Sequence, residues 1–119
     1  MKIEAFEDIE AWKAARTLSR AVHEATRARP PAMDEDLKRQ MRKAAISSMA
    51  NIAEGFDAGT DPEFVRFLRM ARRSATEVQS HLYVALDEKY VKKEQFGPLY
   101  AQAKKVKELI GGFIRYLRS

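Results

Sequence analysis

The sequence lacks cysteine and lacks any long apolar run, and each absence excludes a class of protein. Without cysteine the chain has no disulfide framework and no thiolate metal site, which suits a reducing compartment. Its longest uncharged run, residues 44–53, is well short of the ~20 apolar residues that a membrane-spanning helix needs. The first ten residues carry several charges and contain no apolar signal-peptide core. We therefore expect a cytoplasmic protein that does not insert into a membrane.

Residues that commonly bind metals or cofactors are also few. The two histidines, His23 and His81, lack the glutamate three residues upstream that di-iron helix bundles use. Residues 55–59 contain two glycines, but they lack the lysine and the preceding strand of a phosphate-binding loop. These absences predict a protein with no metal, no cofactor and no enzymatic activity.

Apolar residues instead recur every three or four positions along most of the chain, which is the period of an amphipathic helix. Prolines and glycines divide this pattern into four segments of helical length, at about residues 8–29, 34–56, 61–88 and 93–117. Pro30 and Pro31 are expected to end the first segment, because proline lacks the amide hydrogen that a helix requires. Asp34 or Asp36 is expected to cap the second segment, and Thr60 the third.

Four such segments with short connections predict an all-α fold, an antiparallel up-and-down four-helix bundle. A chain of 119 residues is long enough to bury roughly two-thirds of its unfolded surface around one core, so we expect a single domain over residues 1–119. Gly111 and Gly112 weaken the last segment by about 1 kcal/mol each. Either the close approach of a neighbouring helix or a frayed end would explain them.

The middle of the second segment is apolar on more than one side. At about 100° per residue, one stripe along it is formed by Leu37, Met41, Ala44, Ser48 and Ile52. A second stripe, on the other side, is formed by Ile46, Met49, Ala50 and Ala53. The first stripe can face the core of the chain itself, whereas the second requires another partner. We expect that partner to be a second copy of the chain, so the protein is predicted to be a homo-oligomer.

Basic residues outnumber acidic ones, 22 against 17, and the net charge of +5 favours an acidic partner such as nucleic acid. Two rows of them fall on single helix faces: Lys13, Arg16, Arg20 and Arg27 in the first segment, and Arg66, Arg69 and Arg73 in the third. Such rows can follow phosphates, but they are also the usual solvated cover of a bundle. Neither row is interleaved with aromatic residues, so any nucleic-acid contact is expected to be with the backbone and weakly sequence-specific.

Polar residues of the second and third segments form a further group, which consists of Asn51, Glu54, Ser74 and Glu77. We interpret them as a structural polar network that fixes the register of two helices through mutual hydrogen bonds. The alternative is acid–base chemistry carried by Glu54 and Glu77. Arg73 lies one turn from Glu77 and is the expected ion-pair partner of that carboxylate.

Two motifs in the second segment, residues 40–47 (QMRKAAIS) and 51–56 (NIAEGF), resemble a known family. Further matches are residues 6–9 (FEDI), 12–14 (WKA) and 64–68 (FVRFL). In this order and spacing the motifs resemble the four-helix-bundle proteins encoded by intervening sequences in bacterial 23S ribosomal RNA genes. The resemblance implies a homo-oligomeric bundle, expected to be a pentamer, with no known catalytic activity.

This family is similar in fold to the accessory variability protein of diversity-generating retroelements, which binds nucleic acid and a reverse transcriptase. The resemblance implies RNA or DNA and a nucleic-acid-processing protein as partners, beside further copies of the chain. The sequence departs from the family pattern at three places. Met49 stands where proline is common, Arg73 stands where glycine is common, and residues 57–59 (DAG) replace a basic residue.

Three hypotheses about function follow from these observations. The favoured one is a non-enzymatic homo-oligomer that binds structured RNA or DNA through its basic helix faces. The second is a protein-interaction adaptor that presents the same oligomer surface to a polypeptide. The third is a small enzyme that acts through Glu54 and Glu77.

Overall fold

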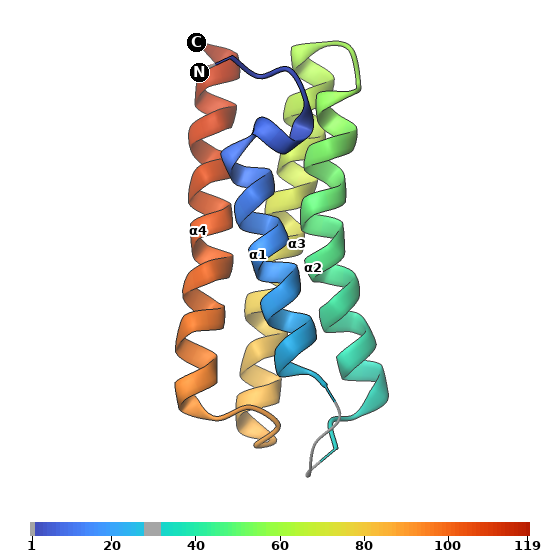
Figure 1. Ribbon diagram of the computed structural model, residues 1–119, viewed down its shortest axis with the longest axis vertical. Helices are drawn as coiled ribbons and strands as arrows, with labels where there is room; N and C mark the ends of the chain where they lie inside the picture. The colour runs from blue at the N-terminus through green and yellow to red at the C-terminus, as the bar shows by residue number, and fades with distance from the viewer. Residues whose placement is uncertain (1, 28–31) are drawn as a thin grey trace.

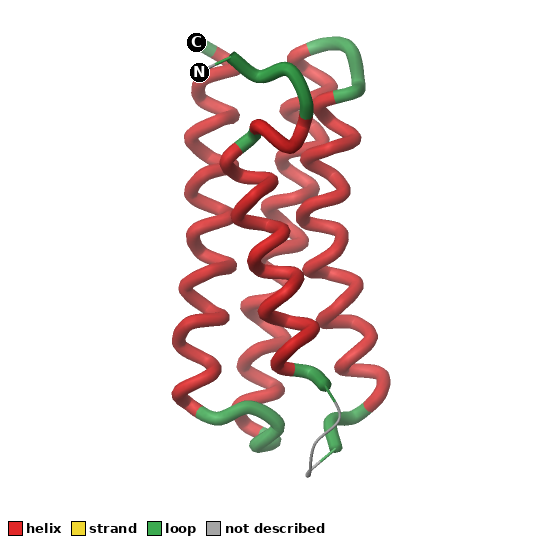
Figure 2. Tube along the Cα trace, viewed as in Figure 1, coloured by secondary structure: helices red, strands yellow, loops and turns green. Residues whose placement is uncertain are grey.

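The structure, a computed structural model, describes residues 2–27 and 32–119, and most of these residues lie in long helices (Figure 1). The helices are α1 (Glu10–Ala25), α2 (Glu35–Phe56), α3 (Asp61–Asp87) and α4 (Lys93–Arg118), with a short 3-10 helix, η1 (Phe6–Asp8), before α1. The described residues contain no strand (Figure 2). The prediction of an all-α protein with four helices is therefore confirmed for this part of the chain.

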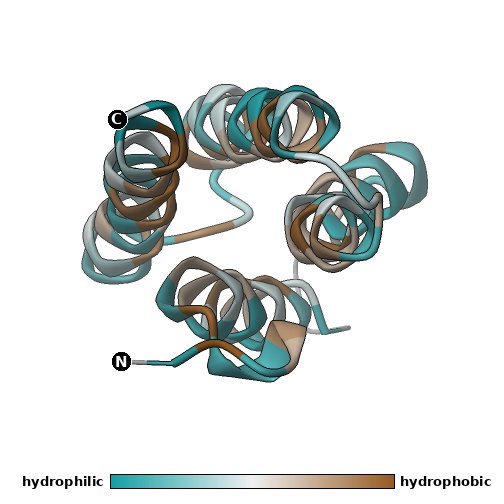
Figure 3. Cartoon of the chain, turned by 90° about the horizontal axis from the view of Figure 1, so that it is seen from above, coloured by the Kyte–Doolittle hydropathy of each residue, from teal (hydrophilic) through white to brown (hydrophobic). Residues whose placement is uncertain are grey.

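Each long helix packs against two others, in the ring order α1, α2, α3, α4 and back to α1. Figure 3 looks along the helices and shows them around a common centre. In Figure 1 the α2–α3 connection and the C-terminus lie at one end of the molecule, and the α3–α4 connection lies at the other. None of the helices among the described residues is long and apolar enough to span a membrane.

The helix starts that the sequence predicts are present in the structure. The Asp34 carboxylate accepts a hydrogen bond from the Leu37 amide at 2.9 Å and caps α2. The Thr60 hydroxyl accepts one from the Glu63 amide at 3.4 Å and caps α3, with Pro62 in the first turn. Each cap satisfies an amide that has no partner within its own helix.

The first helix differs from the predicted range, about residues 8–29, because α1 runs only from Glu10 to Ala25. At its start, Asp8 ends η1 and accepts hydrogen bonds from the amides of Glu4 and Ala5, at 2.9 and 3.1 Å. At its end, the Thr26 hydroxyl donates to the Val22 carbonyl at 2.8 Å. These three bonds offer the backbone an alternative to further helix. The predicted last residues of this helix, 28 and 29, and the two prolines after them lie outside the described residues.

The core lies along the axis of the bundle and is drawn from all four helices. Its largest fully buried side chains include Leu18, Met41, Ile52, Leu68, Leu82 and Ile110. The core stripe predicted for α2 is buried except at Leu37, which is half-buried. Near the end of α2, Gly55 lies so close to α3 that an added Cβ would stand 2.7 Å from the Phe67 Cβ. The absence of a side chain at Gly55 therefore permits the close approach of α2 and α3.

Candidate nucleic-acid interface

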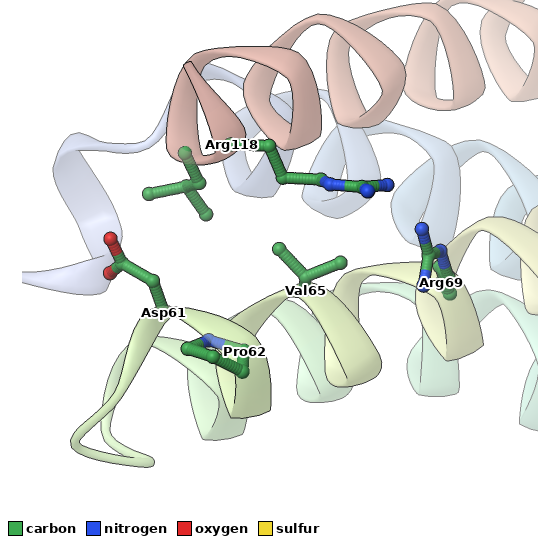
Figure 4. Close-up of a pocket in the computed structure, with 6 residues that line it drawn as sticks. Asp61, Pro62, Val65, Arg69 and Arg118 are labelled. Atoms are coloured by element: carbon green, nitrogen blue, oxygen red, sulfur yellow. The ribbon is translucent and has the colours of Figure 1, made fainter.

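Arginines from two helices meet in a surface groove of about 400 Å³ between α3 and α4. The residues that line it are Asp61, Pro62, Val65, Arg69, Leu117 and Arg118. Figure 4 shows Arg118 reaching from α4 toward Arg69 on α3, with the side chain of Val65 between the two helices. Val65 is buried, so the groove has an apolar floor beneath two charged side chains.

Two more arginines lie farther along the same pair of helices, above Gly111. A Cβ built at Gly111 would stand 3.6 Å from Nη1 of Arg115 and 3.9 Å from Nη1 of Arg72. The two guanidinium groups, one from each helix, therefore come within 4 Å of the same point. We call Arg69, Arg72, Arg115 and Arg118 together the arginine groove.

This arrangement bears on why Gly111 and Gly112 occur within the last helix. The helix α4 continues through Gly111 and Gly112 to Arg118, so the glycines do not mark a frayed end. The space over Gly111 is occupied by arginine side chains and not by the backbone of a neighbouring helix. Within one chain, neither a frayed end nor a closely approaching helix backbone accounts for the two glycines.

The arginine groove has an unbalanced charge. Among residues 2–27 and 32–119, no carboxylate oxygen comes within 4.0 Å, the limit for a salt bridge, of any of its four guanidinium groups. Arginine stays protonated at every physiological pH, and clustered like charges repel one another. An anion in the groove would relieve that repulsion, and planar guanidinium groups match the paired oxygens of a phosphate.

The basic residues predicted on α1 are in a different situation, because two of them already have carboxylate partners. The salt bridges join Lys13 to Glu10 at 3.0 Å and Arg27 to Glu24. The Arg16 guanidinium lies over the Trp12 ring, 5.9 Å from its centroid. Arg20 is exposed. The α1 row is therefore partly neutralised by its own helix.

The three arginines of the predicted row on α3 have different surroundings in the structure. Arg66 is held by Glu63, with Nη2 and Oε2 3.1 Å apart, and it lies 4.8 Å from the centroid of the Phe67 ring. The hydrogen bond to Glu63, together with its charge, raises the pKa of Arg66 above its ordinary value. Arg69 belongs to the arginine groove, and Arg73 is exposed beside it on the same helix.

The sequence interpretation left Arg72 outside the predicted α3 row and missed Arg115 and Arg118. A signal for them was present, because positions 111, 115 and 118 have the spacing of one helix face. Only the pairing of α3 with α4 brings that face against Arg69 and Arg72. That pairing is a property of the fold, and the pattern within either segment does not contain it.

The hydrogen bonds of the predicted polar network involve other residues than those predicted. The Asn51 amide donates to the Ser47 hydroxyl at 3.0 Å, and the Ser74 hydroxyl donates to the same Ser47 hydroxyl at 3.0 Å. Asn51 and Ser74 are therefore joined through Ser47, a residue that the sequence interpretation left out. Glu77 contacts His81 at 3.1 Å, in place of the expected Arg73.

Glu54 is exposed and lines a second groove, on the outer side of α2. None of the hydrogen bonds between described residues connects Glu54 with Glu77, whose carboxylate contacts His81.

The outer side of α2 also carries the predicted oligomer interface. Ile46 is 47% exposed, and Ala50 and Ala53 are half-buried. Met49 is half-buried too, but it packs against the core of its own chain. The second groove, of about 800 Å³, runs along this face and includes Ile46 and Ala50.

Charged residues stand at the two ends of that second groove. Arg39 and Lys43 lie toward the start of α2, and Glu54 lies toward its end. We call this surface, from Arg39 to Glu54, the outer α2 face. Its centre is apolar at Ile46 and Ala50, and its start carries Glu35 beside the basic residues.

Comparison with known proteins places the chain in a family. The family model described as 23S rRNA-intervening sequence protein matches residues 7–112. A protein of unknown function from the S23 ribosomal protein family of Bacteroides thetaiotaomicron has a similar fold, with a TM-score of 0.78. Its crystal structure aligns with 87% of this chain and 97% of its own, at 19% sequence identity. At that identity the likeness concerns the fold alone.

No curated protein matches the chain. The family match covers the motifs at residues 40–47 and 51–56, and it confirms the resemblance that they indicate. The chain belongs to the 23S rRNA-intervening sequence protein family.

Proposed function

We propose that this protein is a non-enzymatic, antiparallel up-and-down four-helix bundle that binds the phosphate backbone of structured RNA through the arginine groove. The observation that carries the proposal is the group of four arginines without a carboxylate within salt-bridge distance among the described residues. The family description refers to an intervening sequence of 23S rRNA, and structured RNA is the ligand that we propose.

Binding of this kind depends on charge and geometry more than on base sequence. Each guanidinium donates paired hydrogen bonds to phosphate oxygens, and each neutralised phosphate releases condensed counterions. Four such contacts give a slope of about −3 for log affinity against log salt concentration. Contacts to phosphate fix the position of the strand and carry no direct sequence information.

We further propose that copies of the chain associate through the outer α2 face, in a homo-oligomer that we expect to be a pentamer. The support for this part is the exposed Ile46, which stands beside Ala50 at the apolar centre of that face. The same face also supports the second candidate function, an adaptor that docks a polypeptide such as a nucleic-acid-processing protein. A partner that stays bound after nuclease treatment would favour the adaptor.

The test compares the two basic surfaces by removing equal charge from each. In fluorescence polarisation with a labelled RNA hairpin, Arg72→Gln with Arg115→Gln should weaken binding about tenfold or more and reduce the salt slope by about 2. The matched variant, Arg16→Gln with Arg20→Gln on α1, should keep nearly wild-type affinity. If the α1 pair loses affinity and the groove pair keeps it, the proposed site is wrong. If the wild-type protein does not bind the hairpin at low salt, the proposed function is wrong.

A further inference from the structure

Three aromatic rings lie together where α3 ends and α4 begins, at the opposite end of the α3–α4 contact from Arg69 and Arg118. Tyr83 of α3 lies 5.0 Å from Phe96 and 5.8 Å from Tyr100, between ring centroids. The rings of Phe96 and Tyr100, both on α4, are stacked 5.5 Å apart with an angle of 25° between them. We call these three residues the aromatic cluster.

Much of the aromatic cluster is accessible to solvent. Tyr83 is 50% exposed, and Phe96 and Tyr100 are half-buried. The neighbouring Tyr100 raises the pKa of Tyr83 above its ordinary value of 10.0, through its charge and a hydrogen bond. The Tyr83 phenol therefore stays neutral at physiological pH and does not repel a phosphate.

Helix geometry places the aromatic cluster on the same side of the molecule as the arginine groove. Tyr83 follows Arg72 by eleven residues, which is close to three helical turns and about 16 Å along α3. On α4, Gly111 follows Tyr100 by the same eleven residues. Because whole turns bring residues back to one face, rings and guanidinium groups lie along a single line on both helices.

Polar and charged side chains lie between them, lysines among them. There the Lys107 ammonium donates a hydrogen bond to the Gln79 side chain at 3.0 Å and links α4 to α3. Lys104, one turn nearer to the rings, is exposed. A chain of phosphates leaving the arginine groove in this direction meets further cations before it reaches the rings.

We propose that the line from the arginine groove to the aromatic cluster binds an unpaired strand of nucleic acid, with phosphates on the arginines and a base stacked on Tyr83. This inference rests on the proposed function and specifies its ligand. A duplex keeps its bases stacked inside, whereas a loop or a single strand can place a base on an exposed ring. On this line the pairing of α3 with α4 places an exposed aromatic cluster beside cations that have no carboxylate within salt-bridge distance among the described residues.

The experiment substitutes Tyr83 in two ways in the full chain. Tyr83→Leu keeps an apolar side chain but removes the flat ring, and Tyr83→Phe keeps the ring. Binding is measured by fluorescence polarisation with an oligouridylate of about 12 nucleotides and with a blunt RNA duplex of the same length, at about 50 mM salt. Circular dichroism and thermal unfolding establish that each variant folds as the wild type does.

We expect Tyr83→Leu to bind oligouridylate about tenfold more weakly, the loss expected when one base loses its stacking platform, and to bind the duplex as before. Tyr83→Phe should retain wild-type affinity for both. If Tyr83→Leu leaves both affinities unchanged, or lowers them equally, the inference is wrong while the proposed function stands. If neither nucleic acid binds to the wild-type protein, the proposed function fails together with the inference.

Discussion

Arg42 on α2 donates a hydrogen bond from Nε to the Thr26 hydroxyl at 2.8 Å, and it thereby fastens the end of α1 to α2. A second, longer bond joins Arg42 Nη2 to the His23 carbonyl at 3.4 Å. Thr26 is 1% exposed, so its hydroxyl has little access to water. Carbonyls and polar side chains at the C-terminal end of a helix need outside partners, and here a neighbouring helix provides one.

We expect Arg42→Ala to lower the free energy of unfolding by about 1–3 kcal/mol, because buried polar groups lose their donor. Urea denaturation monitored by circular dichroism measures the change. Arg39→Ala is the control, since its contact with Asp36 is an exposed pair within one helix and should be worth less than about 1 kcal/mol. Equal losses for the two variants would show that the contact with Thr26 has no special weight.

A second prediction concerns the close approach of α2 and α3 at Gly55. Gly55→Ala would place a Cβ 2.7 Å from the Phe67 Cβ and 2.8 Å from Phe64 Cδ1, so the two helices must move apart. We expect a destabilisation of about 1–3 kcal/mol, the usual cost of overpacking. Gly97→Ala, in α4, has open space around the new Cβ and should stabilise the protein by up to about 1 kcal/mol. Thermal unfolding would contradict this reasoning if both variants shifted the midpoint in the same direction.

A third prediction tests the outer α2 face. Ile46→Glu places a charge at its exposed apolar centre and should reduce the solution mass toward the 13.6 kDa of one chain. Val84→Glu on α3 is the matched control, because Val84 is 46% exposed and undergoes the same chemical change. Light scattering after gel filtration measures both. A wild-type protein that already has the mass of one chain would rule out assembly, and a loss of mass in the Val84 variant alone would move the interface elsewhere.

The fourth prediction is a dependence on pH at the start of the chain. The amides of Glu4 and then Ala5 donate to Asp8, and these bonds lower the pKa of its carboxyl below the ordinary 3.8. A carboxyl whose pKa is lowered by folding stabilises the protein above its ordinary pKa. That contribution is lost as the pH falls through the lowered value.

Titration of the Asp8 carboxyl carbon by NMR should give a pKa below 3.8. Asp8→Asn should speed hydrogen exchange at the Glu4 and Ala5 amides and reduce the loss of stability in acid. Glu7→Gln, at an exposed neighbour, should do neither. A pKa for Asp8 at or above 3.8 would mean that these bonds do not favour the charged form.

The helices were predictable from the sequence where their signals are local. Period, proline and capping residues lie within a few positions of one another, so Asp34 and Thr60 could be identified as helix starts. The end of α1 was not predictable in this way. It depends on Thr26, which is held by Arg42 sixteen residues later, and no pattern within the first segment reveals that contact.

The candidate site was predictable only in part, because it joins residues that are distant along the chain. Arg69 was identified from the α3 row, but its neighbours Arg115 and Arg118 come from α4. Spacing alone also did not separate Arg66, which Glu63 neutralises, from Arg69. Both α3 and α4 carry carboxylates. The side-chain rotamers and the packing of the two helices decide which arginines have a carboxylate partner.

The ring order of the helices places the outer α2 face and the arginine groove on different sides of the bundle. His23 of α1 lines the groove of the outer α2 face, whereas the arginine groove lies between α3 and α4, on the other side of the ring. Copies joined through one surface therefore leave the other uncovered. In the proposed homo-oligomer, once one copy had captured an RNA, its neighbours would meet the rest of that RNA at high effective concentration, and avidity would rise with its length. A weak site in each chain would then be sufficient for tight retention by such an assembly.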